Sequence, residues 1–217
     1  MKRTDRTIRN DYRNPPSLWS ARWIKLSILG AAFLAMLAAV FVVSNRMAAN
    51  MSVGFPNFQD SSFELLDQSG NLRRPDDFLG RPIALFFGFT YCPDVCPTTL
   101  MQLELAKDQL AQSEQSSGNL QILFITVDPT RDTPSQLNAY LSLFDTNVIG
   151  LTGPDSNIAA TLQHFGVYAE KTGNGDDYLY DHSAAVYLYR SDGSFKGTIV
   201  HNEPMEFMVE KLRSILL

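Results

Sequence analysis

The chain has 217 residues, enough for one domain of ordinary size together with further segments. Its charge is uneven. The first 25 residues contain seven basic and two acidic side chains and carry +5; because the whole chain carries −5, the remainder carries −10. Nucleic acid is not expected among the partners of so acidic a domain. The only two cysteines lie four positions apart, too close for a disulfide that stabilises an exported domain, so they are expected to serve reactivity or metal binding.

An uncharged apolar segment, Leu26–Val43, follows the basic end of the chain. As a helix its 18 residues would rise about 27 Å, close to the roughly 30 Å of a bilayer core. A cleaved signal peptide has a shorter apolar region of about 7–15 residues, and the two aspartates before the segment argue against a mitochondrial transit peptide. We therefore expect a basic cytoplasmic tail at 1–25, an uncleaved membrane anchor at 26–43 and a linker at 44–57, with the acidic domain exported.

The first half of the remaining chain has clear strand and helix patterns. Continuous apolar runs, which are typical of strands buried on both faces, occur at Ile83–Phe89 and Leu120–Val127. Between them, Pro97–Ala111 has apolar residues at helical spacing and a proline in its first turn. Two short strand patterns at 63–67 and 71–73, separated by turn residues, predict a hairpin ahead of this unit.

The second half continues the alternation and then ends in a hairpin and a helix. In order, the sequence predicts a helix at 134–144, a short strand at 148–151, a helix at 155–165, a loop at 168–180, strands at 184–189 and 195–200, and a helix after Pro204. Strands separated by helices favour parallel pairing, whereas a hairpin requires antiparallel pairing. The order therefore predicts an α/β domain of thioredoxin-like fold over 58–217, with a mixed central sheet flanked by helices.

The two cysteines lie between the first long strand and the helix that follows it. Cys92 and Cys96 form a Cys-x-x-x-Cys pair, and each is followed by a proline. A helix N-terminus beside a thiol lowers its pKa and favours the thiolate. Two thiolates at this spacing can converge on one ion, and soft sulfur selects Cu(I) or zinc over hard cations.

One of three histidines is placed to join the cysteines. His182 precedes the strand predicted from Ala184, and in a thioredoxin-like fold the start of that strand faces the cysteine loop. Thioredoxin-like reductases carry a cis-proline at this place, but here no proline occurs between Pro154 and Pro204. His182 would complete a site of two sulfurs and one nitrogen, whereas His164 and His201 are expected to be structural.

A third motif follows the second long strand. Asp128-Pro129-Thr130-Arg131-Asp132-Thr133-Pro134 combines opposite charges with two prolines. The motif predicts a rigid loop with an internal ion pair that ends in a helix capped by Thr133. Its carboxylates are poor ligands for a soft metal, so they are not expected to bind the ion directly.

Four segments in this order resemble the SCO/SenC family: 87–97, 127–134, 150–153 and 181–183. The resemblance runs from about Phe58 to the C-terminus, and it implies a membrane-tethered, thioredoxin-like copper protein. The ligands of that family fall on Cys92, Cys96 and His182, the three residues reached above from their chemistry. Tyr91 stands where many relatives carry a histidine, which leaves those three ligands unchanged.

The resemblance also implies a biological role. Members of the family help to assemble the dinuclear copper centre of cytochrome c oxidase, so the cargo is copper as Cu(I), Cu(II) or both. The expected partners are the copper-accepting subunit of the oxidase and another copper chaperone or a thioredoxin-like reductant. The expected location is the inner membrane of a bacterium with the domain in the periplasm. The alternative is the mitochondrial inner membrane, with the domain facing the intermembrane space.

Two enzymatic functions compete with copper delivery. In a thiol–disulfide oxidoreductase, Cys92 and Cys96 would be the catalytic redox pair that reduces a partner's cysteines. A peroxidase is the weaker alternative, because the residues around Cys96 imitate a peroxiredoxin site but position 93 is proline, which lacks the activating hydroxyl.

Overall fold

The computed structural model describes residues 18–50, 55–113, 119–144, 147–173, 175 and 177–216. The chain divides into two compact units, Met1–Val53 and Gly54–Leu217, and each is described by itself. Residues 1–17 of the predicted tail and 51–54 of the predicted linker lie outside the described residues.

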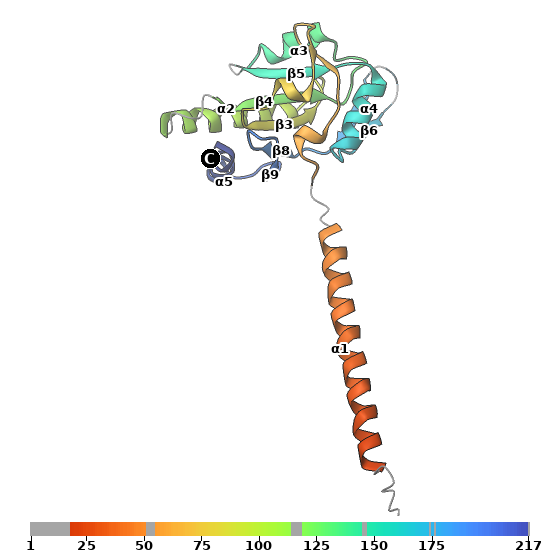
Figure 1. Ribbon diagram of the computed structural model, residues 1–217. Coiled ribbons are helices and arrows are strands. Elements are labelled where there is room, and N and C mark those ends of the chain that lie inside the picture. The colour runs from red at the N-terminus through yellow and green to blue at the C-terminus, as the bar shows by residue number, and fades with distance from the viewer. Residues whose placement is uncertain are drawn as a thin grey trace, which may run out of the picture. The chain divides into compact units, whose positions relative to one another are not determined.

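The first unit contains one long helix, α1, from Leu18 to Asn50 (Figure 1). Its stretch Ile24–Phe41 has a mean hydropathy of 2.2 and is long and apolar enough to cross a membrane. The helix includes the first seven residues of the predicted linker, because Met47, Ala48 and Ala49 are good helix formers that extend a helix already begun.

The second unit is built on a seven-stranded sheet in the order β2-β1-β5-β4-β3-β8-β9. The central strands β3, β4 and β5 are parallel, and the outer pairings are antiparallel, so the predicted mixed sheet is confirmed. The strands are β1 Leu65–Asp67, β2 Leu72–Arg73, β3 Ile83–Gly88, β4 Gln121–Thr126, β5 Val148–Thr152, β8 Val186–Tyr189 and β9 Phe195–Ile199.

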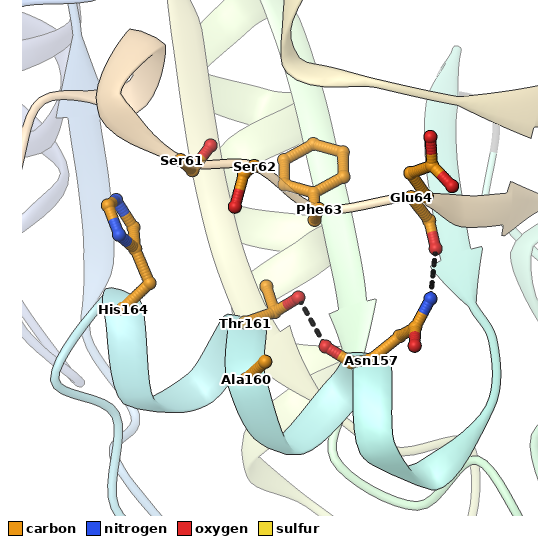
Figure 2. A pocket seen from close by; sticks show the side chains of 8 residues that line it. All are labelled: Ser61, Ser62, Phe63, Glu64, Asn157, Ala160, Thr161 and His164. Carbon is orange, nitrogen blue, oxygen red and sulfur yellow. Dashed lines mark hydrogen bonds between the residues drawn. The ribbon is translucent and has the colours of Figure 1, made fainter.

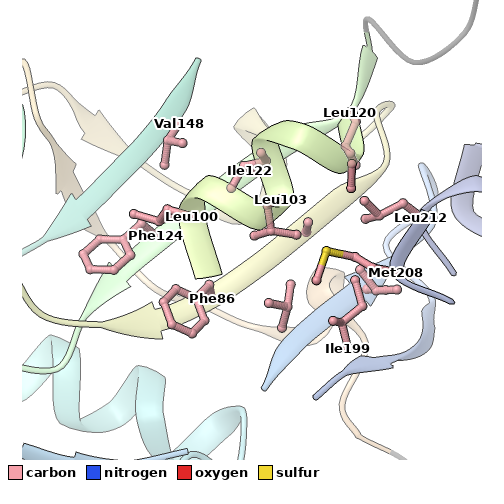
Figure 3. Close-up of a cluster of buried hydrophobic side chains, with 14 of the residues drawn as sticks. Phe86, Leu100, Leu103, Leu120, Ile122, Phe124, Val148, Ile199, Met208 and Leu212 are labelled. Atoms are coloured by element: carbon pink, nitrogen blue, oxygen red, sulfur yellow. The ribbon is translucent and has the colours of Figure 1, made fainter. Parts of the chain in front are cut away.

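Helices cover both faces of this sheet. Successive side chains of a strand point to opposite faces, and every residue of β3 and β4 is buried, so both faces are covered. One face packs Phe86 and Phe124 against Leu100 and Leu212, from helices α2 and α5 (Figure 3). The other packs Phe87 with a second apolar cluster. The helices are α2 Val95–Ser113, α3 Pro134–Leu141, α4 Asp155–His164 and α5 Met205–Leu216, with short 3₁₀ turns η1 Phe58–Asp60 and η2 Pro75–Asp77.

A small hairpin stands apart from the main sheet. Its strands, β6 Ala169–Thr172 and β7 Leu179–His182, pair antiparallel with Ala169 opposite His182. This segment was expected to be a loop up to Tyr180, and that prediction was wrong. The exposed, polar strand residues Glu170 and Lys171 gave no apolar alternation that would have indicated strands.

Candidate metal centre

Cys92 and Cys96 lie where the chain passes from the end of β3 into α2. The helix begins at Val95, two residues before the predicted start, so Cys96 belongs to its first turn and is fully buried. Cys92 is half-buried, and its Sγ accepts a hydrogen bond of 3.4 Å from the backbone N–H of Cys96. Pro97 is tolerated inside the helix because N–H groups of the first turn have no carbonyl partner within the helix.

His182 is the last residue of β7, and its side chain lies beside the two thiols. Its Nε2 lies 3.9 Å from Cys96 Sγ, and its Nδ1 lies 3.0 Å from the carbonyl oxygen of Ser183. A proton on Nδ1 can be donated to that carbonyl, which leaves the Nε2 lone pair directed to the sulfurs. The ring of His182 meets those of Phe86 and Phe89 edge-on, at 6.5 and 5.8 Å between centroids.

The predicted triad is therefore assembled. One ligand atom each from Cys92, Cys96 and His182 lie within 4.8 Å of one another, and this is the one such group of three found among the described residues. His164 ends α4 and His201 follows β9 at the surface, so neither belongs to the group.

The pKa values of the two thiols are shifted in opposite directions. A hydrogen bond from Cys96 is the main cause that lowers the pKa of Cys92 from 9.0 to about 4; burial opposes the shift, and His182 adds to it. The hydrogen bond to Cys92 and burial both raise the pKa of Cys96. The reduced pair thus has a thiolate at the half-exposed Cys92 and a thiol at the buried Cys96.

The motif at 128–134 contacts the loop that carries Cys92. The Arg131 guanidinium forms an ion pair of 2.5 Å with the fully buried Asp128, and the Thr133 hydroxyl caps α3 by accepting the Gln136 N–H at 3.2 Å. The predicted ion pair and helix cap are both confirmed. Asp132 accepts hydrogen bonds from the Thr90 amide and hydroxyl, and it does not belong to the group of Cys92, Cys96 and His182.

A recess of about 220 Å³ opens beside the triad. Cys92 and His182 line it, with apolar contributions from Val95 and Leu179 and an exposed carboxylate from Asp94. The half-buried thiolate is therefore reached from solvent through this recess.

A second recess, of about 270 Å³, lies away from the thiols between the segment 61–64 and α4 (Figure 2). His164 stands at one end and Glu64 at the other. The Thr161 hydroxyl donates to the Asn157 carbonyl at 2.7 Å, and the Asn157 amide donates to the Glu64 carbonyl at 3.0 Å, so these groups serve the fold.

The sequence analysis missed one residue that shapes the centre. A Cβ added to Gly88 would lie 2.7 Å from Cys96 Sγ and 2.8 Å from the Phe124 ring, closer than real Cβ contacts. The signal was a glycine at the end of a buried strand four residues before Cys92, which indicates a close approach of another group.

Comparison with known proteins identifies relatives of the whole second unit. The SCO1/SenC family profile matches residues 53–217. The SCO2-like protein of Rickettsia felis is 33% identical over 186 residues, which cover 83% of this chain and 89% of that protein. The mitochondrial SCO2 homolog of Bos taurus is 42% identical over 135 residues, which cover 61% of this chain and only 50% of the bovine protein.

Solved structures of relatives share the fold. ScoI of Bradyrhizobium japonicum with copper bound superimposes with a TM-score of 0.65 at 35% identity, covering 71% of this chain and 98% of that one. Yeast Sco1 with copper bound gives a TM-score of 0.64 at 35% identity, covering 71% and 86%. The predicted thioredoxin-like fold is confirmed, and the chain belongs to the SCO1/SenC family.

Proposed function

We propose that this protein is a copper chaperone whose cargo binds to Cys92, Cys96 and His182. The observation that carries the proposal is the grouping of two thiol sulfurs and one imidazole nitrogen within 4.8 Å. Metal–ligand bonds of about 2.0–2.3 Å place two donors of one ion at most about 4.6 Å apart, so a small contraction suffices. Thiolates suit Cu(I), and the imidazole adds a ligand that Cu(II) favours. The copper-bound structures of the Bradyrhizobium and yeast relatives support the assignment.

Each residue has a distinct task in this function. The Cys92 thiolate lines the open recess and is already deprotonated for an incoming ion. Cys96 releases its proton when copper binds, because only the thiolate is a ligand. The hydrogen bond from Nδ1 to the Ser183 carbonyl orients His182 so that Nε2 faces the sulfurs.

The expected recipient of the copper ion is the copper-accepting subunit of cytochrome c oxidase. Membership of the SCO1/SenC family supports this role. Another copper chaperone or a thioredoxin-like reductant completes the expected set of partners. The half-exposed position of Cys92 supports direct transfer, since a partner's thiolates can reach the ion through the recess without unfolding of the domain.

Copper titration of the reduced full chain in detergent micelles tests the ligands. Cys92→Ser and Cys96→Ser are expected to abolish stable binding of Cu(I) and Cu(II). His182→Ala is expected to abolish the thiolate-to-Cu(II) absorption and to weaken Cu(I) binding without removing it. His164→Ala and His201→Ala are matched controls that should behave as the unsubstituted protein. Loss of the Cu(II) absorption in either control would contradict the assignment of His182.

A thiol–disulfide oxidoreductase is the second candidate, favoured by the pairing of an exposed thiolate with a buried thiol. The Cys92 thiolate would attack a partner disulfide and release one partner thiolate. Cys96, once deprotonated, would then displace the second, leaving a reduced partner and a Cys92–Cys96 disulfide. Reduction of a disulfide-bonded peptide that survives His182→Ala but not Cys92→Ser would support this activity, whereas its absence would leave copper delivery alone.

For the N-terminal part we propose a cytoplasmic tail at 1–25, an uncleaved anchor at 26–43, a linker at 44–57 and the copper-binding domain at 58–217. The net charge of +5 before the apolar stretch supports a cytoplasmic N-terminus and a periplasmic domain in a bacterial inner membrane. Protease added to spheroplasts should digest the domain and leave a membrane-held fragment. A mature domain that begins near Asn50, or protection of the domain, would contradict the proposal.

A further inference from the structure

In the part of the chain that the structure describes, the hairpin that carries His182 forms a sheet separate from the main one. Within the described residues, β6 and β7 hydrogen-bond as strands only with each other. A two-stranded hairpin alone is marginally stable in water. Only residues 183–185 join β7 to β8, and side-chain contacts with the rest of the domain add to what this short connection fixes about the position of the His182 imidazole.

One such contact joins the hairpin to the 128–134 loop and to the cysteine loop. The guanidinium carbon of Arg131 lies 3.6 Å from the ring centroid of Tyr178, just before β7, and 4.5 Å from that of Tyr91, beside Cys92. Both distances are within the range of a cation–π interaction. The Lys171 ammonium, from β6, lies 3.4 Å from the same Tyr178 centroid, and since two cations cannot share one face, it covers the opposite face.

Asp128 anchors both partners of this contact. Its Oδ2 accepts from Arg131 Nε at 2.5 Å, and its Oδ1 accepts from the Tyr178 hydroxyl at 2.9 Å. Asp128 is fully buried and Tyr178 is only 6% exposed, so the two hydrogen bonds lie in a region of low dielectric, where they are strong. We call the three residues Asp128, Arg131 and Tyr178 the latch.

A continuous series of rings connects the latch to the imidazole. Tyr178 contacts Tyr180 at 5.9 Å between centroids, Tyr180 contacts Phe89 at 5.8 Å, and Phe89 contacts His182 at 5.8 Å. Phe89 and Tyr180 also line the recess beside the thiols. A shift of Tyr178 would therefore be transmitted to the side of the centre where the imidazole stands.

We propose that Arg131 and Tyr178 are positioning residues, which fix the β6–β7 hairpin so that His182 Nε2 is directed at Cys92 and Cys96. The inference rests on the proposed function, because it takes His182 as a copper ligand. The latch touches neither thiol, and Tyr178 is the member that links it to the hairpin carrying the imidazole. Breaking it should weaken Cu(II) binding by about 10–100-fold, the usual cost of losing an outer partner of a ligand. Cu(I), which two thiolates satisfy, should lose much less affinity than Cu(II).

The test measures Cu(II) and Cu(I) affinities and the thiolate-to-Cu(II) absorption of the reduced full chain in detergent micelles. Arg131→Ala leaves Asp128 buried without its cation and can prevent folding. The principal variants are therefore Tyr178→Leu, which removes the ring and the hydroxyl, and Arg131→Lys, which keeps the charge but not the planar stack. Arg74→Lys is the matched control, because Arg74 pairs with Glu64 at the surface, at 2.7 Å.

Each outcome decides the question. The latch is supported if Tyr178→Leu and Arg131→Lys lose Cu(II) affinity selectively. Tyr178→Phe, which keeps the ring, should then lose less Cu(II) affinity than Tyr178→Leu, and Arg74→Lys should lose none. In a His182→Ala background the same substitutions should add nothing to the Cu(II) loss, because the latch acts through that imidazole. Unchanged Cu(II) binding, equal losses for both oxidation states, or an additional loss in that background would overturn the inference. If His182→Ala itself leaves Cu(II) binding unchanged, the proposed ligand is wrong, and the failure lies with the proposed function.

Discussion

Thr90 and Asp132 are 42 residues apart, and two hydrogen bonds join them: the Thr90 amide donates to Asp132 at 3.0 Å and the Thr90 hydroxyl donates to it at 2.6 Å. The hydroxyl of Thr126, the last residue of β4, donates to the same buried carboxylate at 2.6 Å. One side chain thus ties the cysteine loop to the end of the neighbouring parallel strand. The position of Cys92, two residues after Thr90, depends on this carboxylate.

Replacing Asp132 by alanine is expected to destabilise the domain by about 1–3 kcal/mol for each buried donor that loses its acceptor. Urea unfolding of residues 50–217, followed by circular dichroism, measures the change in the free energy of unfolding. The control is Asp94→Ala, which removes an exposed carboxylate with a single hydrogen bond of 3.3 Å to Thr98. Equal stability of the two variants would show that the Thr90 contact contributes little.

Gly88→Ala should disturb the metal centre directly. The new methyl group would lie 2.7 Å from Cys96 Sγ, so the sulfur or the Phe124 ring must move. Weaker binding of both Cu(I) and Cu(II), with a loss of stability of about 1–3 kcal/mol, is expected. Gly197→Ala in β9 is the matched control, because a Cβ there meets no atom within 4 Å. Copper affinities of Gly88→Ala that match those of Gly197→Ala would contradict this view of the site.

The low pKa of Cys92 can be tested by alkylation of the reduced, metal-free protein. The pKa of Cys92 is lowered to about 4, so its thiolate persists as the pH falls and is lost only near pH 4. An ordinary cysteine, by contrast, is already protonated below about pH 9. Iodoacetamide should therefore label Cys92 at pH 6. Cys96→Ala removes the hydrogen-bond donor and should move the midpoint of labelling to higher pH. In Cys92→Ser little labelling is expected, because Cys96 is buried and its pKa is raised.

The sequence predicted those features that depend on local pattern. The all-buried strands β3 and β4 were visible as apolar runs, and the cysteine pair between β3 and α2 was visible as spacing. His182 could be selected because the thioredoxin-like topology places the chain just ahead of β8 beside the cysteine loop. One physical rule, burial or topology, dominated each of these features, and the structure brings the three side chains together, whereas their role as copper ligands stays a prediction.

Other features depend on contacts between distant segments, and no local pattern reports those. The charges of Asp128 and Arg131 indicated an ion pair, but nothing near them showed that Tyr178, 50 residues from Asp128, would donate to the same carboxylate. The hairpin β6–β7 was missed because its strand residues are mostly exposed, so they show no alternation of apolar and polar side chains. The start of α2 was misplaced by two residues, since Pro97 is compatible with several positions of a first turn.

The last prediction concerns the redox state of the centre. Both cysteines are free, and the Cys92 sulfur lies 3.4 Å from the backbone nitrogen of Cys96, so the pair is close in the reduced protein. Oxidation to a disulfide removes two electrons and the Cys96 proton and leaves neither sulfur as a thiolate, and a disulfide sulfur is a far weaker ligand than a thiolate. The oxidised domain should therefore have no measurable Cu(I) binding in a competition assay with a Cu(I)-specific chelator, and a thiol reductant should restore it. His182→Ala, which keeps both cysteines and a weaker Cu(I) binding, serves as the control and should lose that binding on oxidation and regain it with reductant. Tight Cu(I) binding by the fully oxidised domain would mean that residues other than Cys92 and Cys96 hold the ion.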